Sequence, residues 1–247
     1  MALVSLFIPG YNEEKIIEEN LIKVMKVIGD LPWNFEVFFV DDSSTDGTPY
    51  LASRLAKRYQ NLTHLRYEDG PSRRENLAES FKKARGSIIM FMDADLATDM
   101  KNIPTLIRVV EGGYDIATGS RHIGGTVSKR LLSRRLISFG YKHFVKFYFN
   151  SKINDHECGF KAFKREVILD LLNDLGYDYQ LKRKMIWDTE MLLIAQKKKY
   201  KIKEIPIVWS EGAKSALRFG TELSIVPYLL GLKSKLRKIK THSQILK

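Results

Sequence analysis

Two carboxylates separated by one small residue, Asp93 and Asp95, directly follow an apolar run at residues 88–92. Strands that are buried on both faces of a sheet read as continuous apolar runs, and open α/β sheets bind ligands at the carboxyl ends of their strands. Mg²⁺ binds one or two carboxylates together with phosphate oxygens of a substrate. The pattern therefore predicts a divalent-cation site for a phosphorylated ligand, although an isolated Asp-x-Asp also fits an ordinary solvated turn.

Two more predicted strands, at 3–8 and 35–40, also end in polar residues. The residues that follow are Pro9, Tyr11 and Glu13 after the first strand, and Asp41, Asp42 and the run 43–48 after the second. Because parallel strands place their carboxyl ends at one edge, three acidic strand ends would meet there. Carboxylates suit ribose or base edges and a metal suits a diphosphate, so the set favours a sugar nucleotide. The alternative for 43–48 is an Asx turn that leads into a helix capped by Asp46.

The first 120 residues alternate short apolar segments with helical patterns, as βαβ units with a mostly parallel sheet do. We expect strands at 3–8, 35–40, 62–66, 88–92 and 116–118, and helices at 13–28, 46–59, 75–84 and 103–111. The pattern changes after Ser120. There we expect a loop at Gly124 and Gly125, a basic, aromatic-rich helix at 129–149, a helix from Asp188, a strand at 202–208 and a final helix at 221–240.

The composition, with 44% hydrophobic and 28% charged residues in a chain of 247, is that of a soluble globular protein. The single cysteine, Cys158, excludes an internal disulfide and suits a reducing compartment. No apolar run approaches the roughly 20 residues of a membrane span, and no basic leader precedes the first apolar segment. The net charge of +12, concentrated in the second half, requires an anionic partner such as nucleic acid, anionic lipid or a phosphorylated substrate.

Taken together, the motifs resemble the GT-A glycosyltransferases of family 2, and within them the polyprenyl-phosphate (dolichyl-phosphate) hexosyltransferases. The resemblance rests on Pro-x-Tyr-Asn-Glu at 9–13, Val-Asp-Asp-Ser-Ser-x-Asp-Gly-Thr at 40–48, Met-Asp-Ala-Asp-Leu at 92–96, Gly-Ser-Arg at 119–121, Arg-Arg-Leu-Ile-Ser at 134–138, Asp-x-x-Cys-Gly-Phe-Lys at 155–161, Trp-Asp-x-Glu at 187–190 and Glu-Ile-Pro at 204–206. The Cys-Gly-Phe-Lys block, the Trp187 segment and Trp209 are more similar to the glucosyltransferase branch than to the mannosyltransferase branch.

This resemblance implies an α/β fold of the GT-A (nucleotide-diphospho-sugar transferase) type, with a Rossmann-like, mostly parallel sheet flanked by helices. It implies one catalytic domain over 1–247, with a nucleotide-sugar half (1–120), an acceptor half (121–220) and an amphipathic C-terminal helix (221–240). The implied reaction is the inverting, metal-dependent transfer of glucose or mannose from UDP-glucose or GDP-mannose to a polyprenyl or dolichyl phosphate, with Mg²⁺ or Mn²⁺ as cofactor. The sequence does not decide between the two donors.

The resemblance also implies roles for single residues. The nucleoside would be contacted by Pro9, Tyr11, Glu13, Val40 and Asp42. The diphosphate would lie at Asp93, Ala94 and Asp95, with Asp95 as the direct metal ligand, and donor or acceptor phosphates would be bound by Arg121 and Arg134. Two motifs depart from the family pattern. The family's Gly-Lys-Gly loop is replaced by Gly70-Pro71-Ser72-Arg73-Arg74, and its late Gly-Ser-Lys by Gly212-Ala213-Lys214. Arg73 or Lys214 could still supply a cation there.

Asp188 opens a predicted helix, where an acidic residue also complements the helix dipole. A phosphate acceptor is already ionised near neutral pH and needs no general base, so we expect Asp188 to position other groups. Transfer to a hydroxyl acceptor would instead give a carboxylate near this position the role of base.

Two segments combine cations with apolar side chains, which suits the surface of an anionic membrane. The first, 129–149, interleaves Lys and Arg with aromatic residues. In the second, apolar residues recur at intervals of four and three residues, as on one face of a helix, and five cations lie between Lys233 and Lys240. The apolar residues are Ile225, Leu229, Leu232, Leu236 and Ile239. We therefore expect a peripheral protein on the cytoplasmic face of a membrane, with a half-buried helix, a dimer seam or a separate membrane partner protein as alternatives.

Two rival functions remain at this point. One is family 2 transfer to a saccharide or another soluble acceptor. The other is a non-enzymatic, basic nucleotide- or nucleic-acid-binding protein. The ordered carboxylates at the strand ends argue against nucleic acid, because a protein that binds a phosphate backbone has no use for acids there.

Overall fold

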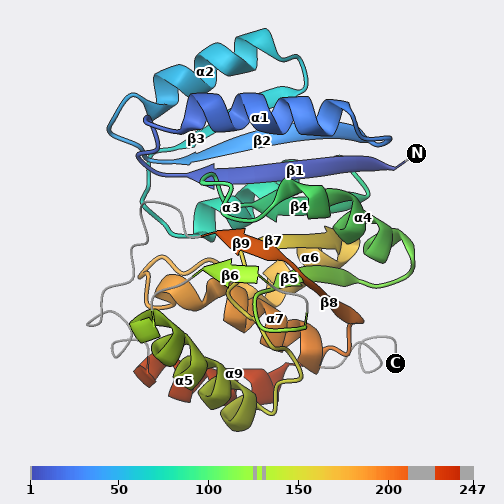
Figure 1. Ribbon diagram of the computed structural model, residues 1–247. Coiled ribbons are helices and arrows are strands. Elements are labelled where there is room, and N and C mark those ends of the chain that lie inside the picture. Colours follow the sequence, from blue (N-terminus) through green and yellow to red (C-terminus); the bar gives the residue numbers. More distant parts are fainter. Residues whose placement is uncertain (1, 125–126, 130–131, 211–225, 240–247) are drawn as a thin grey trace.

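The computed structural model describes residues 2–124, 127–129, 132–210 and 226–239. Its main sheet has seven strands in the order β3-β2-β1-β4-β7-β5-β8, with helices on both faces (Figure 1). β7 runs antiparallel to its neighbours β4 and β5, and the other neighbouring pairs are parallel. The strands of this sheet are β1 (Leu3–Gly10), β2 (Asn34–Asp42), β3 (Leu62–Tyr67), β4 (Ile88–Met92), β5 (Ile116–Ser120), β7 (Phe160–Lys164) and β8 (Ile202–Pro206).

Outside the main sheet, β6 (Val127–Lys129) and β9 (Val208–Ser210) form a two-stranded sheet. The helices are α1 (Ile17–Gly29), α2 (Thr48–Arg58), α3 (Glu75–Ser80), α4 (Ile103–Glu111), α5 (Leu132–Phe149), α6 (Arg165–Leu175), α7 (Trp187–Lys197) and α9 (Val226–Lys238), with 3₁₀ turns η1 (Phe81–Lys83), η2 (Met100–Asn102) and η3 (Lys184–Ile186). No described helix is long and apolar enough to cross a membrane.

The alternation of side chains along β1 builds two cores, one on each face of the sheet. Leu6 and its alternate neighbours pack against α1, α2 and α4, whereas Phe7 packs on the opposite face with α3, α6 and α7. In α1 the residues Ile17, Leu21, Val24 and Ile28 recur at helical spacing and are all buried. Burial of each side chain of this size contributes roughly 1.5–3 kcal/mol to the stability of the fold. The sheet between the two cores is therefore a rigid support for the residues at its strand ends.

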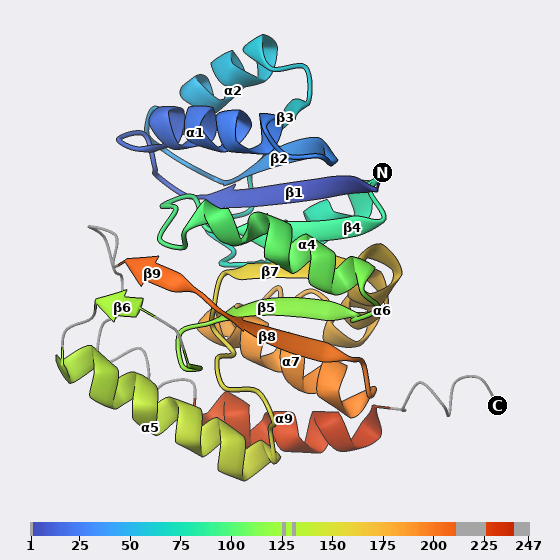
Figure 2. The same ribbon diagram turned by 45° about the vertical axis from the view of Figure 1, so that its right-hand side comes forward.

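A further layer, formed by α5 and α9, packs on α7. Figures 1 and 2 show these two helices side by side, at the end of the molecule opposite α1 and α2. Their shared core contains Val145, Ile186, Leu193, Leu229 and Leu232. Leu229 and Leu232, which are 1% and 2% exposed, therefore serve intramolecular packing. The expectation that they face a membrane or a dimer partner is wrong, and Ile225 lies outside the described residues.

The predicted strands of the first 120 residues all occur, with ends that differ by a few residues. The strand expected at 202–208 is divided, because β9 pairs with β6 and not with the main sheet. The helix expected at 129–149 begins at Leu132, after β6. Sequence reasoning missed β7 and α6. Lys161 and Lys164 interrupt the apolar pattern of β7, yet the structure buries Lys161 completely.

Candidate active site

The carboxyl ends of β1, β2 and β4 meet at one edge of the sheet, at the left of Figures 1 and 2. They border a cavity of about 560 Å³, and Arg73, Arg74 and Leu77 contribute to a further wall. The lining includes eight residues that the sequence predicted at the nucleotide sugar: Pro9, Tyr11, Glu13, Val40, Asp42, Asp93, Ala94 and Asp95. The structure thus brings this predicted set together around one space.

The turn after β1 is fixed by the turn after β2. The backbone N–H of Asn12 donates to Ser44 Oγ at 3.0 Å, and that of Glu13 donates to Thr48 Oγ1 at 2.8 Å. Gly10 is needed here, because a Cβ at this position would lie 2.7 Å from the ring of Phe39. These contacts hold Tyr11 and Glu13 at the mouth of the cavity.

Asp42 anchors the loop that forms one cavity wall. Its Oδ1 accepts hydrogen bonds from Ser72 Oγ and Asn76 Nδ2, both at 2.7 Å. Its Oδ2 accepts from the backbone N–H groups of Ser72 at 2.7 Å and Arg73 at 3.0 Å. A nucleoside would share oxygens that already receive four donors, so direct contact by Asp42 stays a prediction, whereas its support of the loop is observed.

Asp93 and Asp95 have different surroundings. Asp93 Oδ1 accepts from Arg74 Nη2 at 2.9 Å, and a Cβ at Gly159 would lie 1.9 Å from Asp93 Oδ2. Asp95 is exposed, and its Oδ1 accepts from the backbone N–H of Ala97 at 3.0 Å. Partial burial and the charge of Asp93 raise the pKa of Asp95. Asn20 of α1 holds the turn between them through the Ala94 carbonyl, at 2.8 Å.

These two carboxylates fit a hard divalent cation. Among the described residues, no group of three or more His, Cys, Asp or Glu side chains could hold a metal ion. A pair of carboxylates on an open cavity suits Mg²⁺ or Mn²⁺, which can complete their coordination with water and phosphate oxygens. The bare Cα of Gly159 leaves the room that the Asp93 carboxylate needs.

Asp188, at the start of α7, is buried and accepts hydrogen bonds from two cations. Arg74 Nε lies 3.3 Å from its Oδ2, and Lys161 Nζ lies 2.6 Å from its Oδ1. Lys161 also donates to the Cys158 carbonyl. Arg74 and Lys161 lie 5.3 and 5.4 Å from the centre of the Phe91 ring. A carboxylate held in this way suits the predicted positioning role better than that of a base, although that role stays a prediction.

Sequence reasoning missed Arg74 and Lys161 as site residues. It considered Arg73, whose backbone supports the loop, but it is Arg74 that reaches the carboxylates. Lys161 belongs to a motif that carried the family resemblance. That motif was the available signal, because the strand that buries Lys161, β7, was itself not predicted.

Arg121 does not line the cavity. Its Nε and Nη2 donate to the two carboxylate oxygens of Asp155 at 2.6 and 2.7 Å, and its side chain is 9% exposed. Burial opposes the charge of Arg121, but the Asp155 carboxylate outweighs burial and raises the pKa of Arg121. Its phosphate contact stays a prediction. The side chain of Arg134, in the first turn of α5, and all of Lys214 lie outside the described part of the chain.

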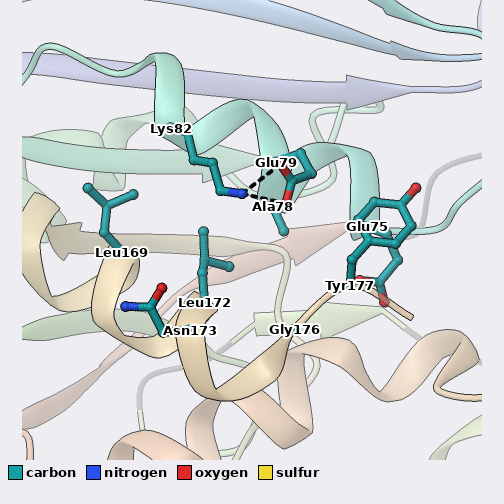
Figure 3. A pocket seen from close by; sticks show the side chains of 9 residues that line it. All are labelled: Glu75, Ala78, Glu79, Lys82, Leu169, Leu172, Asn173, Gly176 and Tyr177. Carbon is teal, nitrogen blue, oxygen red and sulfur yellow. Dashed lines mark hydrogen bonds and ion pairs between the residues drawn. The ribbon is translucent and has the colours of Figure 1, made fainter. Parts of the chain in front are cut away.

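A second pocket, of about 310 Å³, lies between α3 and α6 (Figure 3). Its charged groups already have partners: Lys82 Nζ donates to Glu79 at 2.8 Å, and Glu75 pairs with Arg183 at 2.8 Å. No strand-end carboxylate contributes to its lining. The cavity at the strand ends is therefore the better candidate for chemistry.

The model of glycosyl transferase family 2 matches residues 5–172 of this chain. The chain belongs to glycosyltransferase family 2. The predicted activity class, glycosyl transfer, is thereby confirmed, and the rival interpretation as a non-enzymatic binding protein is set aside.

Among individual proteins, the chain is 35% identical to the glycosyltransferase AglD of Haloferax volcanii over 94% of its own length, but it spans 36% of that relative. It is 29% identical to the dolichyl-phosphate beta-glucosyltransferase of Saccharomyces cerevisiae, over 93% of this chain and 76% of the relative. A mannosyltransferase of Pyrobaculum calidifontis, solved with GDP-Man and Mn²⁺, has a TM-score of 0.62 at 19% identity, covering 97% of this chain and 66% of that one. This likeness confirms the predicted GT-A fold.

Proposed function

We propose that this glycosyltransferase transfers a hexose from a nucleotide sugar to a polyprenyl or dolichyl phosphate, with inversion, at the surface of a membrane. The observation that carries the proposal is the cavity at the ends of β1, β2 and β4, with Asp93, Asp95 and Arg74 on its wall. The name of the yeast relative supports a lipid phosphate as acceptor and glucose as the sugar. GDP-mannose is the alternative donor, since the Pyrobaculum mannosyltransferase was solved with it.

In the donor complex, Pro9, Tyr11, Glu13 and Val40 would enclose the nucleoside, and Asp93 and Asp95 would hold Mg²⁺ or Mn²⁺. The bound metal would offset the charge that develops on the departing diphosphate. Arg74 is the protein cation on the cavity wall closest to these carboxylates, and it would donate hydrogen bonds to the diphosphate.

The acceptor needs no proton removed. An oxygen of the ionised lipid phosphate attacks the anomeric carbon from the side opposite the diphosphate. The new carbon–oxygen bond forms as the bond to the diphosphate breaks, and the nucleoside diphosphate leaves with the electron pair. Asp188 would take no proton in this scheme, and would keep Arg74 and Lys161 in place.

Membrane attachment is supported by the outer face of the α5–α9 layer. Phe147 is 95% exposed and Leu230 is 52% exposed. Lys233 of α9 lies over the ring of Tyr148 of α5, at 4.2 Å, so the two helices present aromatic rings and cations together. Each cation near an anionic leaflet contributes about 1 kcal/mol, which gives marginal, salt-sensitive attachment. The location that we propose is peripheral, on the cytoplasmic face of a membrane, and a membrane partner protein is the alternative anchor.

The donor and acceptor are tested by thermal-shift screening of UDP-glucose and GDP-mannose with Mn²⁺, followed by radiolabel transfer to short polyprenyl phosphates. We expect one donor to stabilise the protein and label to enter the lipid phosphate. Efficient transfer to a saccharide with none to the lipid would favour the soluble-acceptor alternative.

Membrane attachment is tested by co-sedimentation with anionic and neutral liposomes. Phe147→Ser combined with Leu230→Ser should lower recovery with anionic liposomes at low salt. Tyr50→Ser is the matched control, because Tyr50 is 69% exposed on α2, at the other end of the molecule. Equal recovery of the double variant and the wild type would contradict attachment through this face.

A further inference from the structure

Arg74 is held between two carboxylates at the cavity wall. Its Nη2 lies 2.9 Å from Asp93 Oδ1, its Nε lies 3.3 Å from Asp188 Oδ2, and its side chain is 17% exposed. The loop that carries it is tied to Asp42 through the backbone N–H groups of Ser72 and Arg73. Arg74 is thus fixed at its backbone and at its guanidinium group.

The charges around this guanidinium nearly balance. Three carboxylates, Asp93, Asp95 and Asp188, face two cations, Arg74 and Lys161, which leaves one net negative charge. Arginine stays charged in proteins, and the guanidinium of Arg74 lies within ion-pair distance of both Asp93 and Asp188. A divalent cation arriving at Asp93 meets both this positive charge and an oxygen that is already hydrogen-bonded.

We propose that Arg74 is a resident cation that competes with the divalent metal for Asp93 and is released to the diphosphate when the nucleotide binds. This inference rests on the proposed function, since it requires a metal and a diphosphate in the cavity. Arg73 does not share the role, because its backbone N–H donates to Asp42 and its side chain is exposed.

Competition for Asp93 couples the two ligands. In the empty site the metal must displace Arg74, and therefore it binds weakly. A diphosphate offers the guanidinium a new bidentate partner, and thus frees Asp93 for the metal. Because binding free energies are reciprocal, metal and nucleoside diphosphate should each strengthen the binding of the other.

The test is binding of Mn²⁺ itself, followed by the electron paramagnetic resonance signal of the free ion, with and without UDP or GDP. We expect Arg74→Gln to bind Mn²⁺ about tenfold more tightly than the wild type without nucleotide, because a nearby positive charge is removed. The strengthening of Mn²⁺ binding by the nucleoside diphosphate should shrink in this variant. Arg54→Gln, which removes a cation from an exposed pair with Glu18, should leave both quantities unchanged.

Mn²⁺ binding by Arg74→Gln that is equal to or weaker than wild type would overturn the inference. If this variant fails to fold by circular dichroism, Arg74→Lys takes its place. Lysine keeps the positive charge but replaces the planar fork, whose Nη2 and Nε contact Asp93 and Asp188 separately, by a single ammonium group. Its hold on Asp93 should therefore be weaker, so this variant should bind Mn²⁺ severalfold more tightly than the wild type, and equal or weaker binding would again overturn the inference.

Asp95→Asn separates this inference from the proposed function. Loss of Mn²⁺ binding in that variant supports the metal site, on which competition by Arg74 depends. If Asp95→Asn binds Mn²⁺ as the wild type does, or if the wild type binds none even with nucleotide, the proposed metal site fails and the competition fails with it.

Discussion

Two regions of the molecule use charged residues in different ways. Around β1, β2 and β4 the carboxylates border an open cavity, and Asp95 has one backbone donor and exposure to solvent. Between α3, α7 and α9 the charges are buried against one another: Arg183 pairs with Glu75 at 2.8 Å and with Glu190 at 2.9 Å. Lys235 of α9 reaches the same Glu190 at 2.6 Å. Charges of the first region remain available to a ligand, whereas those of the second hold helices together.

The largest loss of activity is expected when Asp95, the exposed carboxylate of the first region, is removed. Asp95→Ala should lower transfer by at least about a thousandfold, because a charged group at the diphosphate is lost while the fold is kept. Radiolabel transfer measures it. Cys158→Ala is the control and should stay near wild type, since burial raises the pKa of this thiol to about 12 and leaves it without a chemical task. Strong, metal-dependent turnover by Asp95→Ala would contradict the assignment.

Breaking the second region should instead cost stability. Arg183→Ala leaves Glu75 and Glu190 buried without their main counter-ion, and should lower the free energy of unfolding by about 3–5 kcal/mol. Urea denaturation measures this change. Lys182→Ala, at the exposed neighbouring position, should change it little. Equal stability of the two variants would mean that the buried cluster does not hold α9 and α3 to α7.

Outside both regions, the buried His156 should make the stability depend on pH. Burial lowers the pKa of His156 from 6.5 to about 4. Between these values the unfolded chain binds a proton that the folded protein does not, so stability is complete above 6.5 and falls as the pH drops toward 4. The loss from this residue approaches roughly 3 kcal/mol. Urea unfolding at several pH values measures it. His156→Asn should flatten the slope in this window, and an unchanged slope would rule out His156 as its source.

Gly159→Ala should displace the carboxylate of Asp93. The new Cβ would lie 1.9 Å from Asp93 Oδ2, so the carboxylate must move, and a displacement near 1 Å costs about a hundredfold in rate. We therefore expect transfer to fall roughly 10- to 100-fold. Gly140→Ala on α5 is the matched control, since a Cβ there meets nothing within 4 Å. Equal activity of both variants would mean that the position of Asp93 is not critical.

The smallest effect is expected at Asp188, whose carboxylate links the regions through Arg74 and Lys161. Asp188→Asn should lower the rate about tenfold, and within about two orders of magnitude at most, because an ionised phosphate acceptor needs no base. A pH–rate profile of the folded variant tests this. A much larger loss that is rescued at high pH would indicate a hydroxyl acceptor.

Sequence reasoning located the first region better than the second, and the reason is physical. Asp93, Asp95 and the residues after β1 and β2 follow their strands directly, so local pattern and the rule for strand ends are enough to bring them together. Arg74 reaches Asp188, 114 residues away in the sequence, and no local pattern encodes that contact. Likewise, the apolar stripe of α9 has the same spacing whether it faces lipid or α7.

The antiparallel strand β7 has a consequence for how the chain assembles. β5 has β7 and β8 as its neighbours in the sheet, and β7 begins 40 residues after β5 ends. As the chain emerges from a ribosome, β1 to β4 can pair early, but β5 must wait for residues 160–164. Until then β4 presents an unpaired edge, which is a template for intermolecular pairing. Such non-local closure is slow, so a nascent chain that stalls before β7 is the form most exposed to aggregation.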